Sequence, residues 1–134
     1  MAAEVTYDYA VIRVVPRVER GERINVGVIL SCVDSDVLEC RFEIDARRLR
    51  VLDATIDVGA IEAAVAAMRA VCAGGPPAGP LAAMSARERF RWLVSPRSTV
   101  IQPSRIHTGR TRDPIAALDH LFATMVRSQP PTSL

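Results

Sequence analysis

The sequence contains no lysine, and all seventeen of its basic residues are arginine. Codon bias in a GC-rich genome is the simpler explanation of this absence. The alternative is selection for the guanidinium group, whose planar fork of donors binds carboxylates and phosphates through paired hydrogen bonds. Composition alone is compatible with both explanations.

Cysteine is also scarce, because the chain has only Cys32, Cys40 and Cys72 and no C-x-x-C pair. An odd number of cysteines at such spacings indicates neither a disulfide framework nor a zinc site. The acidic residues that lie closest together fall in two separate turns instead of on one face. We therefore expect the thiols to be core residues, and we expect no metal site and no cofactor.

Aromatic residues make up only 4% of the chain, whereas hydrophobic residues make up 49%. This composition predicts a core of Val, Ile, Leu and Ala, and 134 residues are enough for one domain of common size. We expect a single α+β domain over residues 6–127, followed by a disordered tail over residues 128–134.

No segment has the pattern of a leader peptide or a membrane span. Residues 1–4 lack a basic region followed by an apolar run, and Gly and Pro interrupt the longest uncharged stretch, residues 70–86. We therefore expect a cytoplasmic protein that does not contact a membrane.

Three segments near the N-terminus have strand patterns, namely residues 7–16, 25–33 and 37–44. They are rich in β-branched residues and are separated by polar turns, which predicts an antiparallel three-stranded meander. In the third segment apolar residues alternate with charged ones such as Arg41, so we expect one face of the sheet to be in water. Gly27, within the second segment, predicts a bulge or the close approach of another backbone.

Two helix patterns follow the meander. Residues 46–52 predict a short helix, and Asp57 caps a longer helix that ends near Ala73, before Gly74 and Gly75. The apolar residues of the longer helix recur at helical spacing: Ile61, Val65, Met68 and Cys72.

Two further helices begin at recognisable caps. Ser85 and Glu88 form a capping box for a helix that ends near Leu93, and Asp113 precedes a proline at the start of the closing helix. In the first of these helices we expect Phe90 and Leu93 to face inward, with Arg87 and Arg91 on the opposite face. The closing helix has an apolar stripe: Ile115, Leu118, Phe122 and Met125.

A late strand at residues 99–102 completes the expected fold. The fold class is α+β, with a four-stranded, mainly antiparallel sheet made of the meander plus this strand. Three or four helices are expected to cover one face of the sheet.

Residues 85–112 form a strongly basic block, because they contain seven arginines and a single acid, Glu88, for a net charge of +6. The second half of this block combines hydroxyl groups, guanidinium groups and a glycine in a loop before the capped closing helix, which are the components of an anion site. The candidate residues for binding an anion or a partner are Arg97, Ser98, Arg105, His107, Thr108 and Arg110. The simpler interpretation is a strand and turns with solvated arginines, because no known phosphate-loop spacing is present.

Two other functions are compatible with the same residues. His107 could act as general acid or base in a small phosphoester- or nucleotide-processing enzyme, although a structural histidine in a turn is the simpler interpretation. The basic block could also bind nucleic acid, but only Phe90 and Trp92 supply aromatic surface near it. Because no catalytic set is complete, the sequence favours a non-catalytic binding module.

Charge is distributed unequally between the two halves of the chain. Residues 1–67 hold 8 arginines and 12 acids, for a net −4, and residues 68–134 hold 9 arginines and 3 acids, for a net +6. Opposite charges, together with Gly27 and the exposed edges of an open sheet, predict a homodimer with a contact near residues 25–28.

Three groups of residues make the chain similar to a known family. They are residues 7–13, residues 22–28, and the run that joins 97–99, 107–109 and 113–114. With these in place, about residues 6–127 resemble the bacterial domain-of-unknown-function family numbered three thousand and thirty-seven.

The resemblance implies a single-domain bacterial protein whose gene lies beside one for a kinase-like protein similar to the HipA toxin kinases. It therefore implies a protein partner, and a role as a binding or regulatory module for the kinase or its phosphorylated product. The family has no established activity, so the resemblance implies no catalytic residues.

Overall fold

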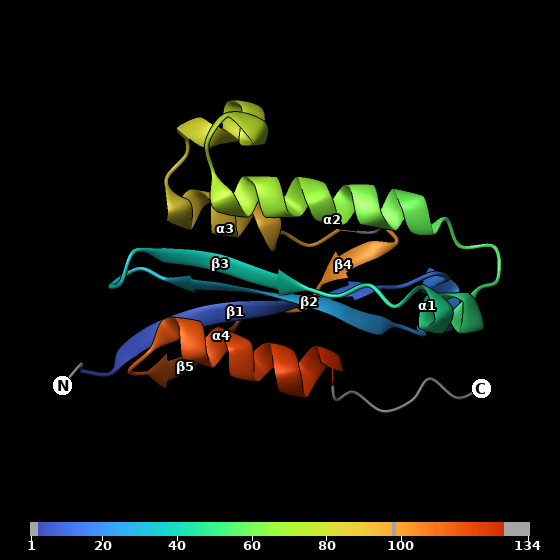
Figure 1. The fold of residues 1–134 in the computed structure, drawn as a ribbon, viewed down its shortest axis with the longest axis horizontal. Coiled ribbons are helices and arrows are strands. Elements are labelled where there is room, and N and C mark those ends of the chain that lie inside the picture. Colours follow the sequence, from blue (N-terminus) through green and yellow to red (C-terminus); the bar gives the residue numbers. More distant parts are fainter. Residues whose placement is uncertain (1–2, 98, 128–134) are drawn as a thin grey trace.

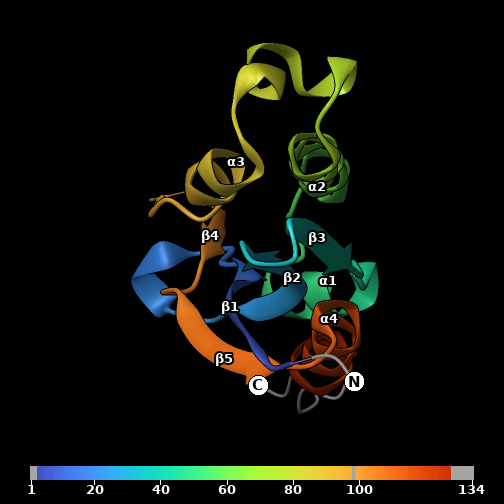
Figure 2. The same cartoon turned by 90° about the vertical axis from the view of Figure 1, so that its left-hand side faces the viewer.

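The computed structural model describes residues 3–97 and 99–127, which form an α+β fold. A five-stranded antiparallel sheet runs through the middle, and helices lie on both of its faces (Figure 1 and Figure 2). The strands are β1 Val5–Val14, β2 Ile24–Cys32, β3 Val37–Phe42, β4 Ile101–Pro103 and β5 His107–Thr111. The predicted fold class is confirmed, and so is the meander of β1, β2 and β3, whose bounds lie within two residues of those expected.

The strand β1 is the centre of the sheet, because β2 pairs with one edge while β4 and β5 share the other. Between β4 and β5, Ser104 continues the hydrogen-bond ladder. Its amide donates to the Val11 carbonyl at 2.7 Å, and its Oγ accepts from the Val11 amide at 2.9 Å. A buried side-chain hydroxyl thus replaces the backbone carbonyl that a straight strand would supply.

The late part of the sheet differs from the expectation. The predicted strand at residues 99–102 is β4, displaced to Ile101–Pro103, and a fifth strand, β5, lies within the expected loop. The sequence of β5 has a glycine and no apolar alternation, so strand patterns do not reveal it. Its Gly109 is required by packing, because a side chain there would overlap the ring of Tyr7 on β1.

One face of the sheet carries α2, Val58–Ala73, and α3, Ala86–Leu93, which the 3-10 segment η2, Pro76–Ala83, connects (Figure 1). Asp57 caps α2 and Ser85 opens α3 with the predicted capping box. The core on this face joins β1 to both helices through Ala10, Ile12, Val14, Ile61, Val65, Met68, Phe90 and Leu93. The short α1, Ala46–Leu52, has the bounds that were predicted.

The opposite face carries α4, Pro114–Phe122, which continues into a π-helical turn, η3, Ala123–Arg127 (Figure 1). The apolar side of this helix packs on β2 through Val28, Leu30, Cys32, Leu118, Leu121, Phe122 and Val126. The expectation that helices cover only one face is therefore wrong. The nearly unbroken apolar run of residues 26–32 is typical of a strand buried on both faces.

The charged side of β3 and the stripe of the closing helix also differ from expectation. Arg41 donates through Nε to Asp119 on α4 at 3.1 Å, so this side of the sheet meets a helix as well as water. Ile115 is 37% exposed. Beyond Phe122 the wider π-helical turn changes the helical register, and Val126 is buried where Met125 was expected.

The bulge predicted at Gly27 is present. Ile12 faces Gly27 and Arg13 faces Asn25, so Val26 is the extra residue of β2. The close neighbour of Gly27 is the ring of Phe42 on β3, where another backbone was expected. Gly27 and Val28 pair with both β1 and β3, and residues 26–28 are buried. The dimer contact near residues 25–28 stays a prediction.

The cysteine and membrane expectations can be compared with the described part of the chain. Cys32 and Cys72 are buried, Cys40 is half-buried, and all three are free thiols.

Among the described residues no single helix is long and apolar enough to cross a membrane, although α2 and η2 meet that test as a pair bent by 55°. The tail predicted over residues 128–134 lies outside the described residues.

Replacing Gly27 with alanine is expected to lower the free energy of unfolding by about 2 kcal/mol, because the added methyl group overlaps the Phe42 ring in a closed core. Urea denaturation measures this loss. The matched variant is Gly59→Ala, on α2. Its methyl group meets no atom closer than 3.4 Å, so this variant should be neutral or stabilising by up to about 1 kcal/mol. Equal losses in the two variants would contradict the proposed overlap.

Candidate functional site

A groove with a volume of about 570 Å³ lies on the α2 and α3 face of the sheet. One wall is α2. The other is formed by Trp92, near the end of α3, and by Arg97, Thr99, Val100 and Ile101. The lining is mostly apolar: Pro16, Ile56, Ala60, Ile61, Ala64, Ala67, Met68, Val71, Trp92, Val100 and Ile101. Its polar residues are Asp53, Thr55, Asp57, Arg97 and Thr99.

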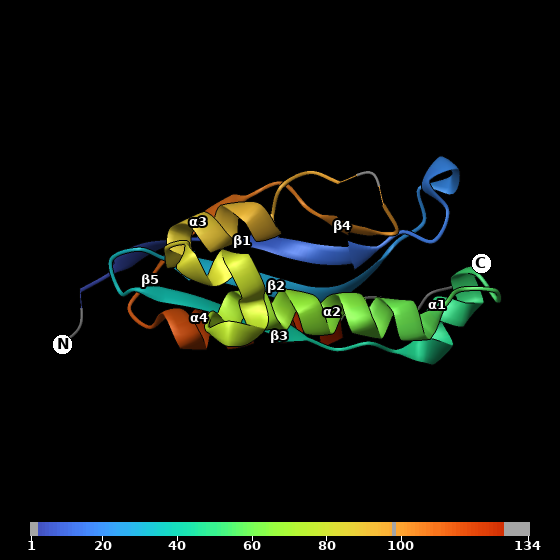
Figure 3. The same cartoon turned by 90° about the horizontal axis from the view of Figure 1, so that it is seen from above.

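The groove exists because α3 is half as long as α2. Helix α2 has 16 residues and α3 has 8, so α3 flanks only part of α2 before the chain turns into an irregular segment (Figure 3). Val100 of that segment accepts a hydrogen bond from the Val15 amide at 2.6 Å, which holds it against the end of β1. The remaining length of α2 is therefore left without a helical neighbour on this side.

Two large apolar side chains in the groove are unusually accessible. Trp92 is 42% exposed and Val100 is 41% exposed, and both line the groove. Large apolar groups that stay exposed in a concave surface are typical of a binding site. Trp92 is also the only tryptophan in the sequence.

Arg97 is the basic residue of the groove. Its Nη2 donates to the Trp92 carbonyl at 3.1 Å, and its guanidinium lies 4.9 Å from the centre of the Trp92 ring. Among the residues that the structure describes, no carboxylate forms an ion pair with Arg97. Its charge is therefore positioned by Trp92, and no carboxylate of the described residues neutralises it.

Two carboxylates of the lining, Asp53 and Asp57, lie near the beginning of α2. Asp57 accepts from the Ala60 amide at 3.0 Å as the cap of α2. Asp53 accepts from the amide and the hydroxyl of Thr55, at 2.9 and 2.7 Å, and these hydrogen bonds lower the pKa of the Asp53 carboxyl. The lining of the groove thus includes one guanidinium and two carboxylates.

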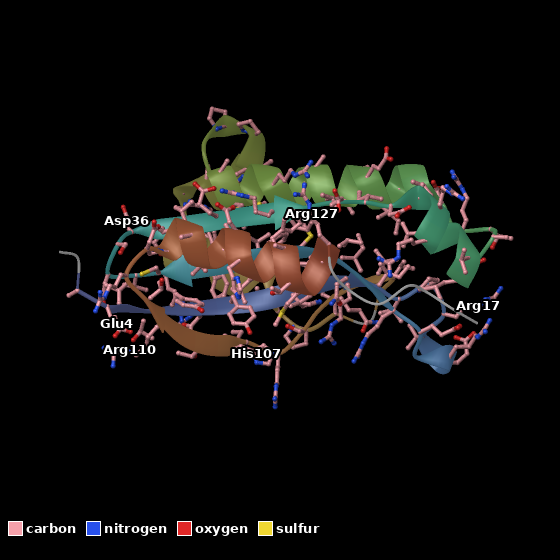
Figure 4. The ribbon with its side chains drawn as sticks, turned by 60° about the horizontal axis from the view of Figure 1, so that its bottom comes forward. Glu4, Arg17, Asp36, His107, Arg110 and Arg127 are labelled. Atoms are coloured by element: carbon pink, nitrogen blue, oxygen red, sulfur yellow. The ribbon has the colours of Figure 1, made fainter. Side chains whose placement is uncertain are left out.

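The six residues predicted to bind an anion or partner do not all meet at this groove. Arg97 lines it, and Ser98 lies outside the described residues. The other four lie on or next to β5, away from α2, where Figure 4 places His107 and Arg110. These four residues are Arg105, His107, Thr108 and Arg110.

His107 is held by its neighbour on the central strand. Its ring stacks on Tyr9 with the ring centres 5.2 Å apart and an angle of 26° between the planes. Within residues 3–97 and 99–127 it forms no hydrogen bond with a second acid or base, and no three metal-binding side chains cluster. In the described part of the chain His107 therefore packs on Tyr9 and has no hydrogen-bonded partner for proton transfer.

Thr108 and Arg87 take part in an internal network instead of an external anion site. The Asp8 carboxylate accepts from Thr108 Oγ1 at 2.6 Å and from Arg87 Nη2 at 2.7 Å. Arg87 also donates through Nη1 to Ser31 at 3.0 Å, and its guanidinium lies over the Phe90 ring. The expectation that Arg87 lies on the open face of its helix is therefore wrong, because it ties α3 to the sheet.

This network controls the protonation of Asp8. Partial burial alone would raise the pKa of the Asp8 carboxyl, but the hydrogen bonds from Thr108 and Arg87 and the charge of Arg87 outweigh it. The pKa of Asp8 is therefore lower than its ordinary value of 3.8. The partners lie 79 and 100 residues away in the sequence, so no local pattern could have revealed the network.

Comparison with known proteins agrees with the resemblance seen in the sequence. The family model described as "Protein of unknown function (DUF3037)" matches residues 9–126. The chain belongs to this family. The DUF3037 match includes all residues that line the groove. No curated protein and no solved structure matches the chain significantly.

Replacing Asp8 with asparagine is expected to lower the free energy of unfolding by about 2 kcal/mol near neutral pH, because two charge-assisted hydrogen bonds are lost. A carboxyl whose pKa is lowered by folding stabilises the protein above its unfolded pKa, and this stabilisation is lost as the pH falls through the folded value. Urea denaturation from pH 7 to pH 2 should therefore show the difference between wild type and variant shrinking below about pH 4.

The control for this measurement is Asp119→Asn, which removes an exposed ion pair with Arg41. It should cost less than about 1 kcal/mol at any pH. A gap between wild type and Asp8→Asn that stays constant down to pH 2 would contradict the assignment of a lowered pKa to Asp8.

Proposed function

We propose that this protein is a non-catalytic binding module that holds an apolar, negatively charged segment of a partner protein in the groove that α2 forms with Trp92, Arg97 and Val100. The observation that carries the proposal is the pairing of exposed apolar surface with an unneutralised charge, at Trp92 and Arg97. The apolar wall would supply affinity, and the guanidinium would select a carboxylate or phosphate on the partner.

The shape of the site supports a protein segment over a small compact ligand. The groove is open and follows α2 for most of its length, from Asp57 to Val71. Its lining is dominated by alanine, valine, isoleucine and methionine, with few polar groups to orient a small polar substrate. Apolar surfaces of this kind are typical of protein contacts.

The alternatives considered from the sequence gain no comparable support. A phosphoester- or nucleotide-processing reaction at His107 would need a second titrating group, and its ring packs on Tyr9 instead. Nucleic-acid binding would need stacking surface beside the exposed arginines of β5, whereas Trp92 lies in the groove against Arg97.

The family resemblance implies a kinase-like protein as the first partner to test. We propose that the protein acts in the bacterial cytoplasm. A homodimer with a contact near residues 25–28 also remains part of this proposal.

Groove variants are expected to reduce capture of the kinase-like protein encoded beside this gene. Ala67→Glu places a charge on the apolar wall and Arg97→Gln removes the guanidinium, so each should weaken binding by about tenfold or more. Binding is measured with immobilised protein and purified partner, and circular dichroism checks that each variant is folded.

The chain offers matched controls for both changes. Ala66 is the neighbouring exposed alanine of α2 that does not line the groove, and Arg110 is an exposed arginine of β5. Ala66→Glu and Arg110→Gln should bind like the parent protein. Loss of binding in Arg110→Gln with full binding in Ala67→Glu would place the contact on β5 and refute the groove proposal.

A further inference from the structure

We infer that Cys40 and Cys72 form a site of reversible oxidation, at which a hydroperoxide joins them in a disulfide bond that links β3 to α2. The inference is independent of the proposed binding function. It starts from two thiols that are far apart in the sequence and meet in the core between the sheet and α2, which lies over β3 (Figure 1).

The two thiols contact each other where α2 packs on β3. Cys40 packs against the core cluster that contains Cys72, and the two side chains form a hydrogen bond. Neighbouring residues have the same register. About one turn before Cys72, Arg69 donates through Nη2 to the Phe42 carbonyl at 3.3 Å. Phe42 follows Cys40 by two residues and therefore lies on the same side of β3.

The surroundings give the two thiols different roles. Cys40 is half-buried on β3, which is the last strand at one edge of the sheet, whereas Cys72 is 4% exposed. The hydrogen bond from Cys72 lowers the pKa of the Cys40 thiol. The charges of Arg69 and Arg41 add to this effect, against burial and the charge of Glu39. Cys40 is therefore the thiol that an oxidant reaches first.

Cys72 is the thiol that completes the disulfide. Its hydrogen bond with Cys40 and its burial both raise the pKa of the Cys72 thiol, so it keeps its proton. A buried, protonated thiol is inert toward an oxidant in solution. It reacts once the neighbouring sulfur has become an electrophile.

The oxidation takes two steps. The Cys40 thiolate attacks one oxygen of the hydroperoxide, the O–O bond breaks, and Cys40 becomes a sulfenic acid. The leaving oxygen takes the proton that Cys40 released and departs as water or an alcohol. The Cys72 sulfur then attacks the Cys40 sulfur, the S–O bond breaks, and hydroxide leaves as water with the Cys72 proton. Two thiols thus lose two electrons to one peroxide, and a dithiol reductant restores them by exchange.

The disulfide would fix the last turn of α2 to the edge strand of the sheet. Helix α2 is also one wall of the groove, so the link would restrain that wall. Disulfides that form in a reducing cytoplasm are usually transient and sense the redox state.

Cys32 provides an internal control. It belongs to the core cluster on the opposite face of the sheet, and its Sγ donates to the Thr6 carbonyl at 3.5 Å. The sheet therefore separates Cys32 from the other two thiols, and we expect it to stay reduced.

The test treats the reduced full-length protein with hydrogen peroxide and maps the products by mass spectrometry. We expect the loss of two of the three thiols and of two hydrogen atoms from the intact mass, with peptides that hold Cys40 and Cys72 joined. Asp34, Asp36 and Glu39 lie between Cys32 and Cys40, so cleavage at acidic residues shows which of them is linked. Dithiothreitol should restore all three thiols. The urea midpoint should rise on oxidation and fall again on reduction, because the link restricts the unfolded chain.

Three variants assign the roles, with circular dichroism to check folding. Cys32→Ala should form the link at the parent rate. Cys72→Ala should stop at a sulfenic acid on Cys40, which dimedone captures. Cys40→Ala should lose thiols about tenfold more slowly than the parent or less, because both remaining thiols are buried.

Mapping of the parent protein decides the inference even where a variant fails to fold. A link that includes Cys32, or disulfide-linked dimers on a non-reducing gel, would overturn it. So would retention of all three thiols at a peroxide concentration that oxidises the urea-unfolded protein. A dimedone adduct on Cys72 that forms in Cys40→Ala at the parent rate would overturn the assignment of Cys40 as the thiol that reacts first.

Discussion

Hydrogen bonding along both edges of β1 is the constraint from which the rest of the structure follows. One edge takes β2, and the other takes two short strands joined by the side chain of Ser104. Buried backbone groups must find partners, so a central strand of ten residues requires a second neighbour along its whole length. That neighbour consists of β4 and β5, from the last third of the chain. The segment after α3 therefore returns across the sheet to reach β4.

The groove is a consequence of the same return. Because the chain leaves α3 after Leu93 to reach β4, it cannot continue as a helix beside α2. Trp92, near the end of α3, lies along one wall with Arg97 and Val100 of the segment that follows, while the alanines of α2 keep the other wall shallow. An apolar surface that the fold itself does not cover is thus a product of topology.

The basic block seen in the sequence has several separate roles in the structure. Arg87 ties α3 to Asp8 and Ser31, Arg89 donates to the Val71 carbonyl at 2.9 Å, and Arg97 lies over Trp92 in the groove. Arg105 and Arg110 are exposed near β5. The arginines of the basic block therefore have three different locations in the structure. Some hold α3 to its neighbours, Arg97 lines the groove, and others are exposed to solvent.

The sequence by itself determined the elements whose signals are local. The caps at Asp57, Ser85 and Asp113 fix the beginnings of α2, α3 and α4, because each side chain satisfies amides only two or three residues away. The meander of β1, β2 and β3 can also be predicted from the sequence, because its turns are short and its strands are rich in β-branched residues.

Only the tertiary structure decided β5, the placement of α4 and the groove. β5 has a polar sequence and becomes a strand because the free edge of β1 pairs with it and Gly109 fits beneath Tyr7. Helix α4 covers the second face because β2 is apolar on both sides, and strand patterns alone do not tell which helix meets which face. Trp92 and Arg97 could be noted in the sequence, but the groove between them and α2 depends on contacts across more than twenty residues of chain, which no local signal encodes.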